Sequence, residues 1–203
     1  MIEEFKIIID SGHGEDGLTA GKRNAYAGTP DGCYEGNDNR LNTKALIKAC
    51  ECKGVNYIDI VGNSPADISL KTRCKTENFY YKSGDVFISN HMNAITGKWQ
   101  EKAHGMRILY KSPEGKKLAQ CISETTGGAN IHNIAKKGFL NAVKSLIVYH
   151  SNLYVLNKTI SPAVLIEWDF MDSLEGLRHV RKYRDQMGVN ILTGVLKYKG
   201  IIS

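Results

Sequence analysis

Residues 6–14 read KIIIDSGHG and carry the strongest indication of the fold in this chain. Lys6 to Asp10 form a short β-branched run that Ser11-Gly12 brings to an end, which predicts a first strand. In open parallel sheets, functional groups gather at the carboxyl ends of the strands. Because His13 comes directly after this strand, the segment predicts both the start of such a sheet and a functional edge.

Strand and helix patterns alternate along the rest of the chain. Further strands are predicted at residues 55–61, 86–90, 105–110 and 162–169, and shorter ones at 146–149 and 152–157. Helices are predicted at residues 38–53, 67–81, 113–125 and 173–198, the last of them broken near Gly188 or Gly194. Near-continuous apolar strands that alternate with helices predict an α/β fold: a twisted, mainly parallel β-sheet of about six strands, flanked by helices on both faces.

Length and composition describe an ordinary soluble protein. The 203 residues suit a single domain, residues 1–203, and 42% are hydrophobic and 24% charged. No apolar run reaches the roughly 20 residues of a membrane helix. The acidic N-terminus MIEEF lacks the basic start of an export signal, so we expect synthesis in the cytoplasm without a signal peptide.

The net charge is +6, because 27 Lys and Arg residues stand against 21 Asp and Glu residues. Such a balance either favours an anionic partner or simply aids solubility. The basic residues are spread along the chain and form no cluster, which argues against nucleic acid as the partner. The sequence does not fix the oligomeric state, and we expect a monomer.

The cysteines are odd in number and scattered: Cys33, Cys50, Cys52, Cys74 and Cys121. This spacing argues against a disulfide framework. Cys50 and Cys52 lie two positions apart in a helical pattern, where side chains do not face each other, so we interpret both as packing residues and not as zinc ligands. The helix at 67–81 is expected to bury Ile68, Leu70, Cys74 and Phe79.

Two histidines and a glutamate stand where folding does not require them. His13 and His91 each follow a predicted strand, and Glu35 precedes the first long helix. Two imidazoles and one carboxylate are a common catalytic zinc shell, which leaves one coordination position for water. Spacing alone leaves a second interpretation open, in which Glu35 is an acid of the first helical turn that complements the helix dipole.

A second carboxylate, Glu167, lies inside the apolar run AVLIEWDF. Burial of a carboxylate in such a run is costly unless the group is paired or used. If this strand ends at the same edge of the sheet, Glu167 can act as the general base for a water at the metal. We interpret the remaining histidines as non-ligands, with His179 on a solvated helix face: His104, His132, His150 and His179.

Taken in order, five motifs resemble the zinc-dependent N-acetylmuramoyl-L-alanine amidases of the type 3 class, which includes autolysins and phage endolysins. They are a strand into D-x-G-H-G at 10–14, Glu35 before a long helix, L-x-x-R at 70–73, a strand into S-x-H-x-N-A at 89–94, and P-A-V-L-x-E at 162–167. The resemblance spans nearly the whole chain in order and in approximate spacing. Each motif is weak alone, but the combination is specific.

This resemblance implies an enzyme that hydrolyses the amide bond between N-acetylmuramic acid and L-alanine in bacterial peptidoglycan. It implies Zn²⁺ held by His13, Glu35 and His91, with Glu167 as the catalytic residue, and it assigns no substrate-binding residue. Together with the missing export signal, it points to a phage or prophage endolysin that acts on the cell wall after release. A cellular autolysin is the alternative, and any wall-binding module lies outside these residues.

Two features depart from the family pattern. Asp169 stands where the family has glycine, and its charge either raises the pKa of Glu167 by like-charge repulsion or points away. The loop at 15–34 is long and rich in glycine and is expected to shape substrate access. Two rival functions stay open: a zinc peptidase that cuts within the stem peptide, and a non-catalytic peptidoglycan-binding module on an amidase-like fold.

Overall fold

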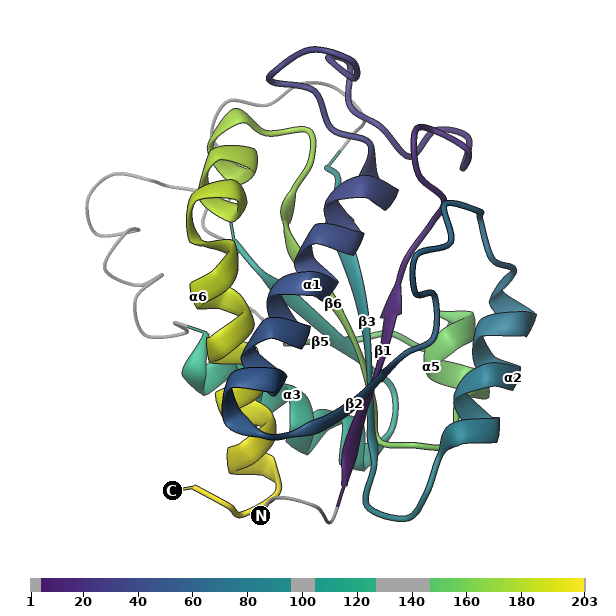
Figure 1. Cartoon of the computed structure of the whole chain (residues 1–203), viewed down its shortest axis with the longest axis vertical. Helices are drawn as coiled ribbons and strands as arrows, with labels where there is room; N and C mark the ends of the chain where they lie inside the picture. Colours follow the sequence, from purple (N-terminus) through teal and green to yellow (C-terminus); the bar gives the residue numbers. More distant parts are fainter. Residues whose placement is uncertain (1–4, 96–104, 127–146, 203) are drawn as a thin grey trace.

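The computed structural model describes residues 5–95, 105–126 and 147–202. Within them one sheet has the strand order β2-β1-β3-β6-β4-β5 (Figure 1). Its strands are β1 (Lys6–Ser11), β2 (Asn56–Asp59), β3 (Val86–Asn93), β4 (Arg107–Tyr110), β5 (Ile147–Tyr149) and β6 (Ala163–Phe170). β2, β1, β3 and β6 run parallel, whereas β4 is antiparallel to β6 and parallel to β5. The predicted six-stranded, mainly parallel sheet is confirmed.

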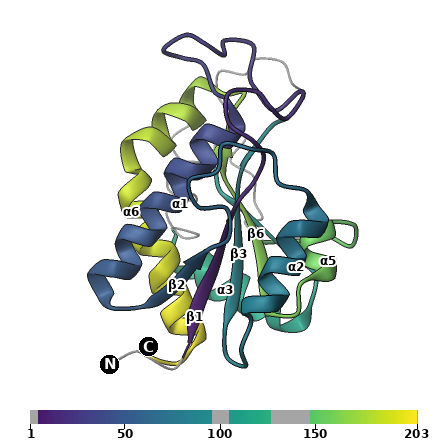
Figure 2. The ribbon, with the colours of Figure 1, turned by 45° about the vertical axis from the view of Figure 1, so that its right-hand side comes forward.

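Helices cover both faces of this sheet (Figure 2). One face carries α1 (Glu35–Lys53), α3 (Pro113–Thr125) and α6 (Leu174–Tyr198), and the other carries α2 (Leu70–Tyr80) and α5 (Tyr154–Lys158). Successive residues of a strand point to opposite faces. Ile7 and Ile9 therefore belong to the larger core under α1 and α6, and Ile8 to the smaller core under α2 and α5. Among the helices of the described residues, none combines the length and apolar character needed to cross a bilayer.

The C-terminal helix α6 is continuous, so the predicted break near Gly188 or Gly194 is wrong. A Cβ atom on Gly188 would lie 2.7 Å from the backbone oxygen of Ala45 in α1. A Cβ atom on Gly194 would lie 2.4 Å from the Cα of Ile122 in α3. These glycines let α6 approach its neighbours closely, and a well-packed helix tolerates their lower helix propensity.

Two further predictions about local structure are wrong. Residues 152–157, expected as a strand, contribute to helix α5, because a short apolar run does not distinguish a strand from a buried helical turn. Helix α2 starts at Leu70 and not at residue 67, and the side chains of Leu70 and Phe79 are 53% and 80% exposed. The face that α2 buries is largely polar: Arg73, Cys74 and Glu77.

All five cysteines carry free thiols. Cys50 is buried against the larger core, as expected for a packing residue. Cys52 is exposed, so its interpretation as a packing residue is wrong. Two residues separated by two positions point in different directions from a helix, and only one of them reaches the core.

Candidate metal centre and active site

The carboxyl ends of β1, β3 and β6 meet at one edge of the sheet. In the β1–β3 register Ser11 lies opposite Asn90, and in the β3–β6 register His91 lies directly opposite Glu167. His91 is part of β3 and does not follow it, because this strand continues to Asn93. The fold thus brings Glu167 beside His91 without any loop between them.

The turn after β1 packs against the His91 ring. The backbone N–H of Gly12 donates to the carbonyl oxygen of Asn90 at 3.0 Å, which extends the β1–β3 pairing. A Cβ atom on Gly12 would lie 2.1 Å from His91 Cε1, so only glycine leaves room for the ring. The next residue, His13, has a φ of 64° in the left-handed region, and its carbonyl oxygen accepts a hydrogen bond from Arg40 of α1 at 2.9 Å. Helix α1 therefore holds the turn that positions His13.

Glu35 is the first residue of α1 and joins the two imidazoles. Its Oε1 lies 3.0 Å from His91 Nδ1 and 3.3 Å from His13 Nε2. The two rings meet edge to face, with centroids 4.9 Å apart. One ligand atom from each of these three residues lies within 4.8 Å of the others, and no other such group of His, Cys, Asp and Glu occurs in the described residues. We call His13, Glu35 and His91 the metal set.

The electrostatics of the metal set favour an ionised Glu35. Burial opposes ionisation of this carboxyl, but the contacts with His13 and His91 outweigh it and lower its pKa. Burial lowers the pKa of His13, and the pull of Glu35 does not fully offset it. Burial also disfavours the charged form of His91, yet Glu35 raises the pKa of that ring overall. The cluster therefore pairs a carboxylate with two imidazoles whose pKa values are shifted in opposite directions.

Glu167 lies in β6 with its Oε2 buried and without a hydrogen-bond partner. Burial, followed by repulsion from Glu35, raises its pKa to about 7, although His91, Lys22 and Arg107 act in the other direction. A carboxyl with this pKa exchanges protons near neutral pH, which suits a general acid–base group. The like-charge repulsion that raises the pKa of Glu167 comes from Glu35.

The side chain of Asp169 is fully buried. Its Oδ1 accepts hydrogen bonds from the backbone N–H groups of Gly105 and Phe170, and its Oδ2 lies 3.0 Å from His179 Nδ1. These contacts direct the Asp169 charge to the start of β4 and to α6. The expectation that His179 lies on a solvated helix face holds only in part, because its side chain is 34% exposed and its ring pairs with a buried carboxylate.

The other histidines lie elsewhere. His150 follows β5, and its Nδ1 accepts a hydrogen bond from the backbone N–H of Asn152 at 3.3 Å. His104 and His132 lie outside the described residues.

A cleft of about 740 Å³ opens over the metal set. Glu167 lines it, and so does Lys22 of the long loop, whose Nζ lies 3.5 Å from Glu35 Oε2. Lys22 is not among the site residues predicted from the sequence. A lone lysine in a glycine-rich loop carries no pattern, and only the folded loop places it at the cleft.

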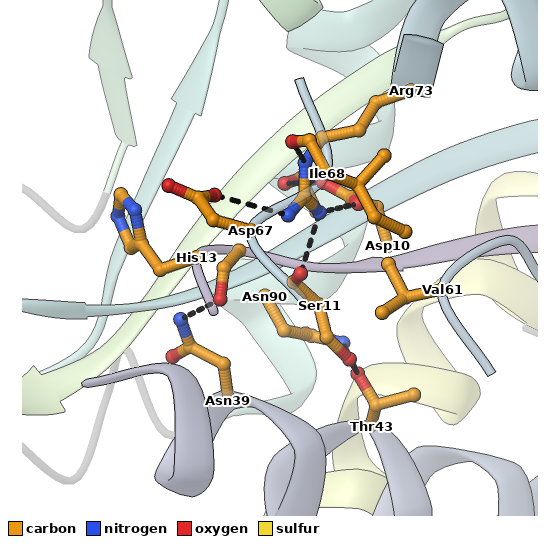
Figure 3. Close-up of polar contacts among 12 residues, drawn as sticks. Asp10, Ser11, His13, Asn39, Thr43, Val61, Asp67, Ile68, Arg73 and Asn90 are labelled. Atoms are coloured by element: carbon orange, nitrogen blue, oxygen red, sulfur yellow. Dashed lines mark hydrogen bonds and ion pairs between the residues drawn. The ribbon is translucent and has the colours of Figure 1, made fainter. Parts of the chain in front are cut away.

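A second buried polar cluster lies next to the metal set (Figure 3). Arg73 of α2 forms an ion pair with Asp10 and donates to the carbonyl oxygens of Ser11 and Ile68 at 2.5 and 2.8 Å. The second oxygen of Asp10 accepts a hydrogen bond from Ser89 Oγ at 2.6 Å. The L-x-x-R motif thus supplies the cation that neutralises a carboxylate at the end of β1, a role that its pattern alone did not reveal.

Comparison with known proteins identifies relatives of this chain in sequence and in structure. Residues 7–197 match the sequence profile of the N-acetylmuramoyl-L-alanine amidase family. The solved structure of an N-acetylmuramoyl-L-alanine amidase from Clostridium difficile 630 superposes with a TM-score of 0.74 at 27% identity, covering 98% of each chain. An uncharacterized protein of Clostridium perfringens is 27% identical over 154 residues, which are 71% of this chain and 40% of that protein.

An uncharacterized cell wall amidase of Bacillus anthracis is 24% identical over 203 residues, covering 98% of this chain and 36% of that protein. The chain therefore spans about two fifths of the length of the curated relatives it matches. The profile match covers nearly all of this chain, including the carboxyl ends of β1 and β3 and the start of α1. The chain belongs to the N-acetylmuramoyl-L-alanine amidase family.

Proposed function

We propose that this chain is a zinc-dependent N-acetylmuramoyl-L-alanine amidase that hydrolyses the bond between N-acetylmuramic acid and L-alanine in peptidoglycan. The observation that carries the proposal is the juxtaposition of the metal set with Glu167. A three-donor cluster and a carboxyl with a pKa of about 7 line the same cleft. Amide hydrolysis needs a means to polarise the carbonyl and a base for the attacking water.

The donors of the metal set fit zinc. Two imidazoles and one carboxylate form a zinc shell that leaves a position for substrate or water, whereas magnesium and calcium take mainly oxygen ligands. His13 Nε2 and Glu35 Oε2 are buried and have no hydrogen-bond partner. Buried polar atoms normally have such a partner, so these atoms favour a ligand that the cluster is built to hold.

Glu167 is proposed as the proton carrier of the reaction. Zinc, when bound, supplies a Lewis acid that polarises the scissile carbonyl and acidifies water. Glu167 as a carboxylate accepts a proton from the attacking water while the water oxygen bonds to the carbonyl carbon. Glu167 then gives this proton to the amide nitrogen as the C–N bond breaks. The products are a carboxylate on the lactyl group and a free amine on L-alanine.

The biological setting is part of the proposal. We propose that residues 1–203 act as one catalytic domain, that peptidoglycan is the partner, and that the enzyme is an endolysin that reaches the wall after release from the cytoplasm. The charge of +6 suits an anionic wall surface. Production in a susceptible host tests the endolysin role: we expect lysis only after the membrane is permeabilised, and lysis of intact producing cells would contradict it.

Digestion of purified peptidoglycan with and without a chelator tests the activity, with the new ends identified by mass spectrometry. We expect free lactyl carboxyl groups on the glycan and free L-alanine amines on the peptide. Chelation should abolish their release, and added zinc should restore it. Cleavage within the stem peptide would identify a peptidase instead. Binding to the wall without cleavage in the presence of zinc would identify a non-catalytic module.

A further inference from the structure

Lys22 lies on a hairpin, residues 22–35, whose backbone is fixed beside the metal set. The backbone N–H of Glu35 donates to the carbonyl oxygen of Lys22 at 2.9 Å. Asn24 ties the same hairpin to the end of β6, because its Nδ2 donates to the carbonyl oxygen of Met171 at 3.0 Å. The Cα atom of Lys22 is therefore held at the cleft, while its side chain stays 42% exposed and keeps its reach.

The ammonium of Lys22 faces the reacting groups. Its Nζ lies 3.5 Å from Glu35 Oε2, at ion-pair distance and without a hydrogen bond. Burial dominates the pKa of both His13 and Glu167, and the charge of Lys22 contributes to each by lowering it. Lys22 is thus close enough to influence both the metal set and the proposed base.

The other basic side chain that lines the cleft, Arg73, already has an ion-pair partner and hydrogen-bond partners. Among the described residues that line the cleft, the Lys and Arg residues are Lys22 and Arg73. Arg73 is buried, forms an ion pair with Asp10 and donates to two backbone carbonyl oxygens. Lys22 has no carboxylate within 4 Å among the described residues other than Glu35, which the proposed function assigns to the metal.

We propose that Lys22 is a catalytic residue, whose ammonium stabilises the negative charge that develops on the scissile carbonyl oxygen. This inference rests on the proposed function. As water adds to the carbonyl carbon, an electron pair moves onto the carbonyl oxygen beside the ammonium. The charge leaves that oxygen again when the C–N bond breaks and the amide nitrogen takes its proton from Glu167. Lys22 itself gains and loses no proton.

Physical reasons favour this role over a purely structural one. A cation held in place before the reaction stabilises developing charge without solvent reorganisation, which is the basis of oxyanion stabilisation. If Lys22 merely balanced the charge of Glu35, its removal would change zinc affinity. If Lys22 merely bound a substrate carboxylate, its removal would change KM. Under the proposed role, its removal changes kcat with the metal and the substrate bound, and it also weakens binding of a transition-state analogue where Glu167 is replaced by Gln, which an effect through the pKa of Glu167 would not do.

The kinetic test compares Lys22→Met and Lys22→Arg with wild type at saturating zinc, on a soluble muramoyl peptide. We expect kcat of Lys22→Met to fall about 10- to 100-fold, with KM little changed, since one partly exposed donor is lost. Lys22→Arg keeps a cation and should recover most of the rate. Lys116→Met, an exposed lysine on α3 outside the cleft, is the matched control and should behave as wild type.

Two binding measurements by calorimetry separate the possible roles. In a Glu167→Gln background, Lys22→Met should weaken binding of a phosphinate analogue of the scissile amide by the same factor as kcat, and leave binding of the intact substrate unchanged. Zinc affinity should not fall. An unchanged kcat, a change in KM alone, or a loss of zinc affinity would overturn the inference. A wild-type enzyme without activity would overturn the proposed function, whereas an active wild type matched by Lys22→Met overturns the inference alone.

Discussion

Two buried carboxylates lie at the same edge of the sheet and differ in how their oxygens are used. Asp10, at the end of β1, has a partner for each oxygen: Arg73 for one and Ser89 for the other. Glu35, at the start of α1, shares Oε1 between His91 and a backbone N–H, while its Oε2 has no hydrogen-bond partner. Both carboxylates are 1% exposed, so burial does not explain the difference.

This difference indicates that Asp10 and Glu35 have different roles. A buried charge is tolerated when it is paired and hydrogen-bonded, and removing one partner leaves the other uncompensated. Both oxygens of the buried Asp10 carboxylate have a partner, so this carboxylate meets the condition. The ion pair with Arg73 also connects β1 to α2. The metal set and Glu167 leave lone pairs aimed into a cleft, as expected of groups that await a ligand. The Asp10–Arg73 cluster should therefore control stability, and the metal set together with Glu167 should control activity.

The variant Glu167→Gln should separate activity from stability most clearly. Gln has nearly the same shape but accepts no proton at neutral pH, so we expect kcat to fall by about 10²- to 10⁴-fold. Zinc affinity, measured by calorimetry, should stay close to that of wild type. The melting temperature at pH 8 should not decrease, since the variant removes a carboxylate that burial disfavours. Near-normal turnover would remove Glu167 from the mechanism.

The variant Arg73→Met should have the opposite profile. It leaves Asp10 charged and buried without its cation, and we expect the free energy of unfolding to decrease by about 3–5 kcal/mol. Urea denaturation of the metal-free protein measures this loss. Lys48→Met, which breaks the exposed pair with Asp185, is the control and should change stability little. Equal effects of the two variants would contradict the structural role of the Asp10–Arg73 cluster.

The titration of Glu167 should give the smallest of these effects. In the metal-free protein its carboxyl should titrate near pH 7, well above the ordinary value, as read by carbon NMR of labelled glutamate. The folded state then binds this proton more tightly than the unfolded chain, so this group's contribution to stability is full at low pH and is lost as pH rises towards 7. Added zinc should lower the pKa, because a nearby dication favours the carboxylate. A pKa that zinc leaves unchanged would place Glu167 away from the metal.

The sequence was most informative where one pattern served both fold and site. The β-branched run before Asp10 and the apolar run around Glu167 predicted strands, and their polar residues marked the sheet edge. It was least informative where a single residue type has two uses. Gly188 and Gly194 were expected to break a helix and instead allow close packing. Periodicity does not reveal what lies against a residue.

The partners of buried groups were also invisible in the sequence. His179 was expected to face solvent and pairs with Asp169. The cation that Asp10 requires is 63 positions away, and the Lys22 ammonium comes to Glu35 only through the folded hairpin. Such contacts join segments far apart in the chain, so no local pattern encodes them.

The alternation of strands and helices, the parallel sheet, and the residue types that gather at its edge can be predicted from the sequence, because they follow from local periodicity and from motif order. The folded chain, in contrast, determines which buried atoms lack a hydrogen-bond partner, which charges form ion pairs, and that His91 of β3 lies opposite Glu167 of β6. Pairing, burial and pKa depend on distances between elements. Those distances are set by packing and not by position in the chain.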